Sequence, residues 1–237
     1  MRKTRKTVVA ICTALLLAPL PEGASRVQAS PAEKSALDAY HRQLRALDLP
    51  PGLGEPAMRP DPIREVTLAP LFDEPFACTE HPLGQLTGTG DALGTDCMIV
   101  GGATDETHGY NKLYRGLGEK NEDWYGWHKA VHAPFDSVVT FVHVNPVTNL
   151  PGSMGKPPAS AILFQRADGM NVIYAHIAEF RVRPGDHVKA GDVVALDSDN
   201  GFARNPHVHV GAYKGTEPFQ IRWDLKAMGA VPALSAN

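Results

Sequence analysis

Short apolar runs separated by turn residues make up the pattern of the chain from about residue 76 onwards. Each run is bounded by Gly, Pro, Asn or Asp, and together they cover residues 98–100, 137–144, 159–165, 171–176, 182–188, 192–196 and 208–213. This pattern is typical of β-strands. The turn Ala167-Asp168-Gly169 predicts that the strands before and after it form a hairpin. Because no long amphipathic helix lies between the runs, we predict a mostly antiparallel β domain over residues 76–237.

The segment before this domain has a different pattern. Ser30-Pro31-Ala32-Glu33 carries helix-start signals, and Leu37, Tyr40, Leu44 and Leu47 follow at helical spacing. A short N-terminal helix is therefore expected over about residues 31–48. Residues 49–75 are rich in Pro and acids with little periodicity, which indicates a linker or a strap across the domain. We accordingly treat residues 30–75 as one N-terminal region that either regulates the domain or serves as a spacer.

The first 29 residues have the composition of a secretory signal peptide. Four basic residues at the start precede an apolar run from Val8 to Leu17, and Val27-Gln28-Ala29 resembles a cleavage site. The apolar run is too short to span a bilayer comfortably, and no later stretch is long enough to do so. We therefore expect a secreted or periplasmic protein of the cell envelope, without a transmembrane segment after signal cleavage.

Charge excludes one class of partner. Removal of residues 1–29 takes away five basic residues and one acidic residue, which leaves 18 Lys and Arg against 25 Asp and Glu. A nucleic-acid-binding domain normally carries a basic face, so nucleic acid is not expected as a partner.

Two cysteines remain in the mature chain, Cys78 and Cys97. In an oxidising compartment an isolated pair is more often bridged than free, so we predict a structural disulfide. A zinc site built on these cysteines is less favoured, because the chain has no Cys-X-X-Cys spacing.

The candidate chemistry lies near the end of the chain, in Pro206-His207-Val208-His209-Val210. Residues two apart on a strand face the same side, so His207 and His209 would project together while the valines face an apolar layer. A third histidine, His176, ends an earlier predicted strand. Two imidazoles held on one stiff strand form half of a metal site.

Several short sequence motifs around these histidines resemble those of one enzyme family. They are Ala133-Pro134-Phe135-Asp136, Tyr174-Ala175-His176, the double Gly-Asp turn of Pro184 to Asp192, and Pro206-His207-Val208-His209. Their order and spacing over about residues 95–213 are similar to M23-family (lysostaphin/LytM-type) zinc metallopeptidases. The resemblance implies a lysostaphin-like β-sandwich, a duplicated hybrid motif with an open groove. It also implies one Zn²⁺ per chain.

In that family a His and an Asp from an upstream segment, and the second His of His-X-His, hold the metal. The resemblance therefore assigns His209 as one ligand. The family's usual His-X-X-X-Asp is absent here, and we expect His108 and Asp123 to replace it. Rival ligands are His128 and His132, which are four positions apart, and more faintly Glu80 with His81.

Two imidazoles and one carboxylate would leave zinc one open position for water. By resemblance, His176 and His207 act as catalytic groups that move a proton or stabilise an oxyanion. The expected function is an exported zinc endopeptidase that cuts stem or crossbridge peptides of bacterial peptidoglycan. Alternatives are a catalytically inactive M23-like activator of cell-wall hydrolases, which would act on an envelope protein partner, and a lipoyl-type carrier with a modified lysine.

Overall fold

The computed structural model describes residues 53–104 and 109–231, together with helical positions 35, 38, 39, 42 and 46. The apolar runs form thirteen short strands within this part of the chain. The first seven are β1 (Glu65–Leu68), β2 (Phe76–Glu80), β3 (Thr95–Ile99), β4 (Ala130–His132), β5 (Ser137–His143), β6 (Ala161–Gln165) and β7 (Asn171–Ala175). The others are β8 (Ile177–Ala178), β9 (His187–Val188), β10 (Val193–Asp197), β11 (Val208–Lys214), β12 (Glu217–Pro218) and β13 (Gln220–Trp223). Two short helical turns accompany them, η1 (Asn121–Asp123) and α2 (Leu225–Met228).

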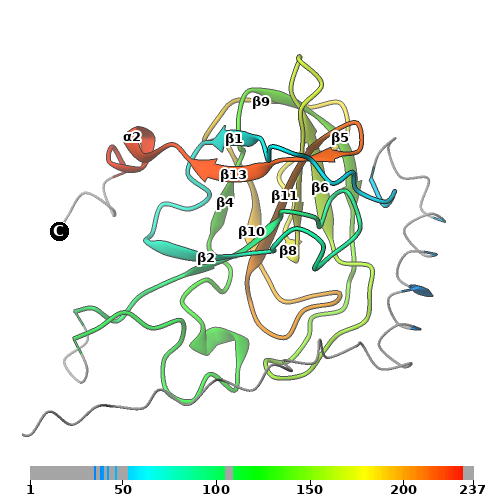
Figure 1. Cartoon of the computed structure of the whole chain (residues 1–237). Helices are drawn as coiled ribbons and strands as arrows, with labels where there is room; N and C mark the ends of the chain where they lie inside the picture. The colour runs from blue at the N-terminus through cyan, green and yellow to red at the C-terminus, as the bar shows by residue number, and fades with distance from the viewer. Residues whose placement is uncertain are drawn as a thin grey trace, which may run out of the picture.

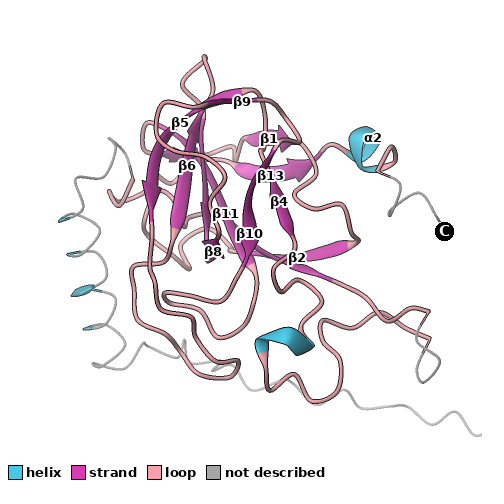
Figure 2. Ribbon diagram, turned by 180° about the vertical axis from the view of Figure 1, so that it is seen from behind, coloured by secondary structure: helices cyan, strands magenta, loops and turns pink. Residues whose placement is uncertain are grey.

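Antiparallel pairing dominates, as expected for the fold class (Figure 1). The larger sheet has the order β2-β3-β11-β7-β6-β5-β9, with β12 paired to β11, and a smaller sheet has the order β4-β10-β8. The predicted hairpin is confirmed as β6–β7. The predicted strand 182–188 is wrong over most of its length, because only His187 and Val188 pair with β5. Figure 2 shows the strands from the opposite side.

The core is built mainly from the central strands of the larger sheet. Side chains on both faces of β6, β7 and β11 are buried, so these strands read as nearly continuous apolar runs rather than alternating ones. The fully buried members include Ile162, Phe164, Val172, Tyr174, Val208 and Val210. This placement makes β7 and β11, which carry the predicted site histidines, the most firmly packed part of the molecule.

The segment that we read as a linker or strap is part of the packed unit over its described residues. β1 pairs in parallel with β13, and Leu68, Leu71 and Phe72 belong to the main core. Leu53 packs in a second buried cluster with Leu163 and Tyr213. Proline interrupts periodicity in this segment, which concealed its apolar anchors. The predicted N-terminal helix is helical at the five positions described, and the predicted signal peptide lies outside the described residues.

None of the described helices has the length and hydropathy that crossing a bilayer requires.

The predicted disulfide is confirmed and joins Cys78 on β2 to Cys97 on β3. The two cysteines are directly opposed in the antiparallel pair, with a Cα–Cα distance of 4.1 Å. Since β2 is the edge strand of the larger sheet, the bridge fixes its register on β3.

Replacing both cysteines, as Cys78→Ala with Cys97→Ala, should lower the free energy of unfolding by about 3 kcal/mol, because the unfolded chain regains the entropy of an open loop. Chemical denaturation of both forms checks this. Equal stability of the two forms would contradict it.

Candidate metal and catalytic site

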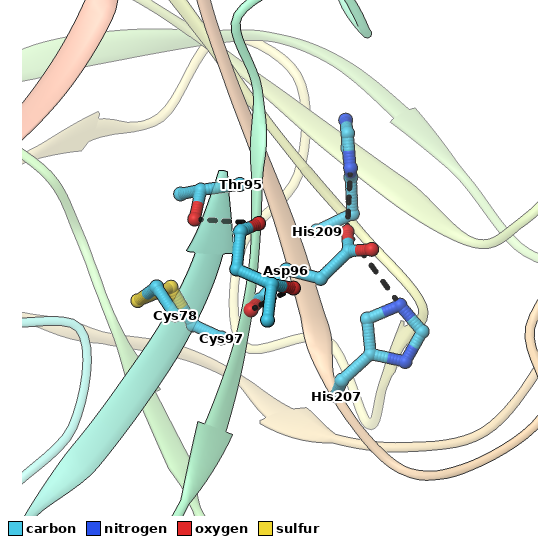
Figure 3. The surroundings of a disulfide bond; sticks show 7 residues. Cys78, Thr95, Asp96, Cys97, His207 and His209 are labelled. Carbon is cyan, nitrogen blue, oxygen red and sulfur yellow. Dashed lines mark hydrogen bonds and ion pairs between the residues drawn. A yellow bond between two sulfur atoms is a disulfide. The ribbon is translucent and has the colours of Figure 1, made fainter. Parts of the chain in front are cut away.

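Four neighbouring strands bring the polar side chains of the site together at one end of the sheet. Asp96 on β3 is directly opposed to His209 on β11, so both side chains project from the same face. His81 follows the last residue of β2, where its N–H donates to the carbonyl of Gly94 at 2.8 Å. His176 follows the last residue of β7. This strand pairs with the edge of β11 that is opposite β3. Figure 3 shows the Asp96 carboxylate between His207 and His209, next to the disulfide.

Asp96 is the centre of this group. Its Oδ1 lies 2.9 Å from Nδ1 of His209, and its Oδ2 lies 3.2 Å from Nε2 of His81. Oδ1 also lies 3.8 Å from Nε2 of His207. Among the described residues, His81, Asp96 and His209 form the one group of three such ligands, with donor atoms all within 4.8 Å of one another.

Each of the four imidazoles is anchored through one nitrogen to a backbone carbonyl. His81 Nδ1 donates to Asp91 O at 3.1 Å, and His209 Nε2 donates to Gly90 O at 3.2 Å. His207 Nδ1 donates to Asn205 O at 2.8 Å, and His176 Nδ1 donates to Asn200 O at 2.7 Å. The other nitrogen of each ring is directed to the site side, where a neutral ring can act as a ligand or proton acceptor.

Glycines let the ligand histidines and their backbone acceptors come this close. A Cβ on Gly94 would lie 2.9 Å from Cε1 of His209, and a Cβ on Gly211 would lie 1.8 Å from the oxygen of Gly90. Neither space admits a side chain. The turn of residues 88–94 is therefore seated directly on β11.

Electrostatics divide the group into a charged pair and two neutral rings. Burial by itself would raise the pKa of Asp96, because it disfavours the charged carboxylate. The hydrogen bonds to His209 and His81 outweigh this effect and hold the pKa of Asp96 below its usual range. Burial also disfavours the charged form of His209, yet the bond to Asp96 raises the pKa of His209 to about 9. Burial, then repulsion from His207 and His209, lowers the pKa of His176 to about 3. Burial likewise lowers the pKa of His207.

This donor set fits a zinc ion. One carboxylate and two imidazoles are a usual zinc ligand set, and both imidazoles already have carbonyl partners on their outer nitrogens. Asp96 and His209 share a proton, so the space between them favours positive charge. A divalent cation would replace that proton. His81, Asp96 and His209 are the residues that would hold the ion.

The structure brings together His209, His207 and His176 from the predicted set, but not Asp123. Asp123 lies on η1, where its carboxylate accepts from the backbone N–H of Lys120 at 3.2 Å. His108 lies outside the described residues. Beside His209 the structure places His81 and Asp96, which are 15 positions apart, as are His108 and Asp123. The pair His108 and Asp123 stays a prediction.

The rival ligands have other partners. The ring of His128 stacks on Trp127 with centroids 4.2 Å apart, and His132 Nε2 lies 3.2 Å from Asp73. Glu80 accepts from Gln220, so of the faint alternative only His81 belongs to the site. Asp96 was missed, although a signal was present. A disulfide between Cys78 and Cys97 makes their two strands neighbours. It therefore brings Asp96, which precedes Cys97, close to the end of β2.

A cavity of about 320 Å³ opens over these groups. One wall is polar, with Asp91, Asp96 and four histidines. The other carries apolar residues and one arginine, namely Leu86, Met154, Ala159, Ala175, Phe202, Ala203 and Arg204. The arrangement suits an extended peptide that lies between a cation-binding wall and an apolar wall.

Comparison with known proteins gives a family match over part of the chain. The sequence profile of peptidase family M23 matches residues 125–221, a segment that contains His176, His207 and His209 but neither His81 nor Asp96. Residues 125–221 are therefore similar to peptidase family M23. No curated protein matches the chain significantly.

Three solved structures illustrate the similarity. The catalytic domain of the prophage-encoded M23 protein EnpA from Enterococcus faecalis is 21% identical, covering 62% of this chain and 88% of its own, with a TM-score of 0.40. The lysostaphin catalytic domain from Staphylococcus simulans is 16% identical, covering 60% and 82%, with a TM-score of 0.36. A zinc-containing peptidase from Vibrio cholerae is 14% identical, covering 60% and 53%, with a TM-score of 0.32.

The ligand set can be tested by metal content. His81→Ala and Asp96→Ala should each bind zinc at least tenfold more weakly than the wild type, because each removes one of three ligands. Asp123→Ala should bind zinc as the wild type does. Competition with a chromophoric chelator measures all three. Zinc loss in Asp123→Ala with retention in Asp96→Ala would restore the upstream pair expected from the sequence.

A second prediction concerns Asp199, whose side chain is buried and accepts from Asn149 at 3.0 Å. Burial raises the pKa of Asp199 to about 6, although the Asn149 bond opposes this. Between pH 4 and 6 the Asp199 carboxyl is therefore protonated in the folded protein but ionised in the unfolded chain. The free energy of unfolding falls as the pH rises through this window. Relative to the wild type, Asp199→Asn should gain up to about 3 kcal/mol over the same window. Urea unfolding at pH 4 and pH 7 measures the difference, and a constant difference would contradict the assignment.

Proposed function

We propose that the chain is an exported zinc endopeptidase that hydrolyses peptide bonds of bacterial peptidoglycan. One observation carries the proposal: the His81–Asp96–His209 group and the imidazoles of His176 and His207 face one cavity. The match of residues 125–221 to peptidase family M23 supports peptidase chemistry in general. The signal-peptide pattern of residues 1–29 and the Cys78–Cys97 disulfide support action outside the cytoplasm.

A zinc ion held by this group would supply Lewis-acid activation of the scissile carbonyl and of the attacking water. His81 and His209 are fixed by their carbonyl partners, so the donor atoms need little rearrangement to bind the ion. Asp96 supplies the negative charge that holds a divalent cation in this buried place.

His207 and His176 are suited to proton transfer. Their pKa values are lowered by burial, so both rings are neutral at pH 7 and either free Nε2 can accept a proton from the attacking water. The ring centroids are 4.6 Å apart, which allows one imidazole to take the proton while the other donates to the developing oxyanion or to the leaving amine. Asn205 O and Asn200 O keep the two rings aimed at the cavity.

The substrate class follows from the cavity and the compartment. An open hollow with a small apolar wall accepts a chain of Gly or Ala residues better than one with bulky side chains. The peptides of the cell wall have this character, and an exported enzyme meets them. An envelope protein partner is not needed for this proposal.

Substitutions separate metal binding from proton transfer. His209→Ala should lose both zinc and hydrolysis of purified wall, whereas His207→Ala should keep zinc and lose about 10²–10⁴-fold in kcat/KM. Zinc analysis and release of amino groups from the wall measure the two properties.

His187→Ala is a matched control, because His187 is exposed on β9 away from the cavity and should keep wild-type zinc content and rate. A zinc-loaded wild type that releases no amino groups from any wall, with His209→Ala unchanged in zinc content, would overturn the proposal. Zinc binding without hydrolysis would favour the inactive activator.

A further inference from the structure

Two loops that lie side by side form the apolar wall of the cavity. Residues 149–155 and 199–204 are joined by three backbone hydrogen bonds, from Asn149 N to Asp199 O, from Gly152 N to Arg204 O and from Gly155 N to Ala203 O, at 2.8, 2.7 and 3.1 Å. We call these two segments the two-loop wall. The first loop lies in the Pro- and Gly-rich stretch 145–158, and loops of this length are commonly functional.

The buried side chain of Asn149 holds the two loops together. Its Nδ2 lies within hydrogen-bond distance of Asp199 Oδ1, Gly201 O and Ala203 O, at 3.0, 3.1 and 3.2 Å. The backbone around it is packed too tightly for extra atoms, because a Cβ on Gly155 would lie 2.0 Å from Oδ1 of Asn149. The two-loop wall therefore presents its outward side chains from a firmly held backbone.

The outward side chains of the two-loop wall are two large apolar groups and one cation. Met154 and Phe202 are 40% and 50% exposed, although both line the cavity with His176, His207 and His209. Arg204 is exposed beside them and is the one Lys or Arg among the cavity-lining residues that the structure describes. The described acids of the cavity are Asp96, which bonds His81 and His209, and Asp91, whose Oδ1 lies 3.5 Å from His209.

We propose that Arg204 is a specificity residue that binds a carboxylate of the peptide substrate, while Phe202 and Met154 contact small apolar side chains on either side of it. The inference rests on the proposed function. A guanidinium presents a planar fork of N–H donors that matches a carboxylate, and Arg204 forms no ion pair with an acid among the described residues. The substrate is thus a wall peptide with a free carboxylate near the bond that is cut, rather than a neutral crossbridge.

The test uses crosslinked muropeptide dimers whose stems carry free carboxylates, and the same dimers after carbodiimide-mediated conversion of those groups to carboxamides. The wild type should cleave the carboxylate dimer with a kcat/KM about tenfold or more above that for the amidated dimer. Arg204→Ala should lose this discrimination, and Arg204→Lys should retain part of it because a point charge replaces the fork.

Arg181→Ala is the matched control, because Arg181 is also exposed but does not line the cavity, and it should keep the wild-type preference. Cleavage of both dimers at equal rates, or a preference that survives Arg204→Ala, overturns the inference and leaves the proposed function intact.

Binding separates the inference from the proposed function. The dissociation constants of both dimers are measured by calorimetry for His207→Ala, with and without Arg204→Ala. Tighter binding of the carboxylate dimer that depends on Arg204 supports the inference even if the wild type cleaves neither dimer, a result that would overturn only the proposed function. Equal binding of both dimers, or no binding of either, overturns the inference.

Discussion

The Asp96 carboxylate is the interaction on which the site depends. It is half-buried on β3, in hydrogen-bond contact with His209 and His81 and near His207. A buried carboxylate is stable only if positive charge and hydrogen bonds surround it. Asp96 therefore favours a cation beside it, which in the metal-free protein is protonated His209 and in a loaded protein would be the divalent ion. Every other feature of the site positions groups around this one anion.

The strands at one edge of the larger sheet position these groups. β2 and β3 extend the larger sheet beyond β11, and the disulfide between Cys78 and Cys97 fixes the edge strand in register. The turn of residues 88–94 then returns over β11 and accepts hydrogen bonds from both ligand imidazoles. The site thus depends on a covalently fixed edge and on glycines that allow close approach, rather than on the central strands alone.

Rigid loops complete the cavity on the other side. The buried Asn149 amide ties the loop before β6 to the loop before β11, and Asn200 both anchors His176 and bonds to Ser160 and Ile177. These buried hydrogen bonds hold the two loops in place, although Oδ2 of Asp199 has no partner among the residues that the structure describes. The long Pro- and Gly-rich segment is consequently a structural wall of the site and not a loose connection.

The sequence by itself determined the local features of this protein. Short apolar runs and turn residues predicted the strands β3, β5, β6, β7, β10 and β11, the β6–β7 hairpin and the shared facing of His207 and His209, because these depend on residues close together in the chain. The two cysteines predicted the disulfide, and the motifs predicted the family. Only the tertiary structure placed His81 and Asp96 beside His209 and packed residues 53–75 into the core. His81 and Asp96 meet His209 through the registers of β2, β3 and β11, and strand registers between distant segments leave no local periodicity from which this group could have been predicted.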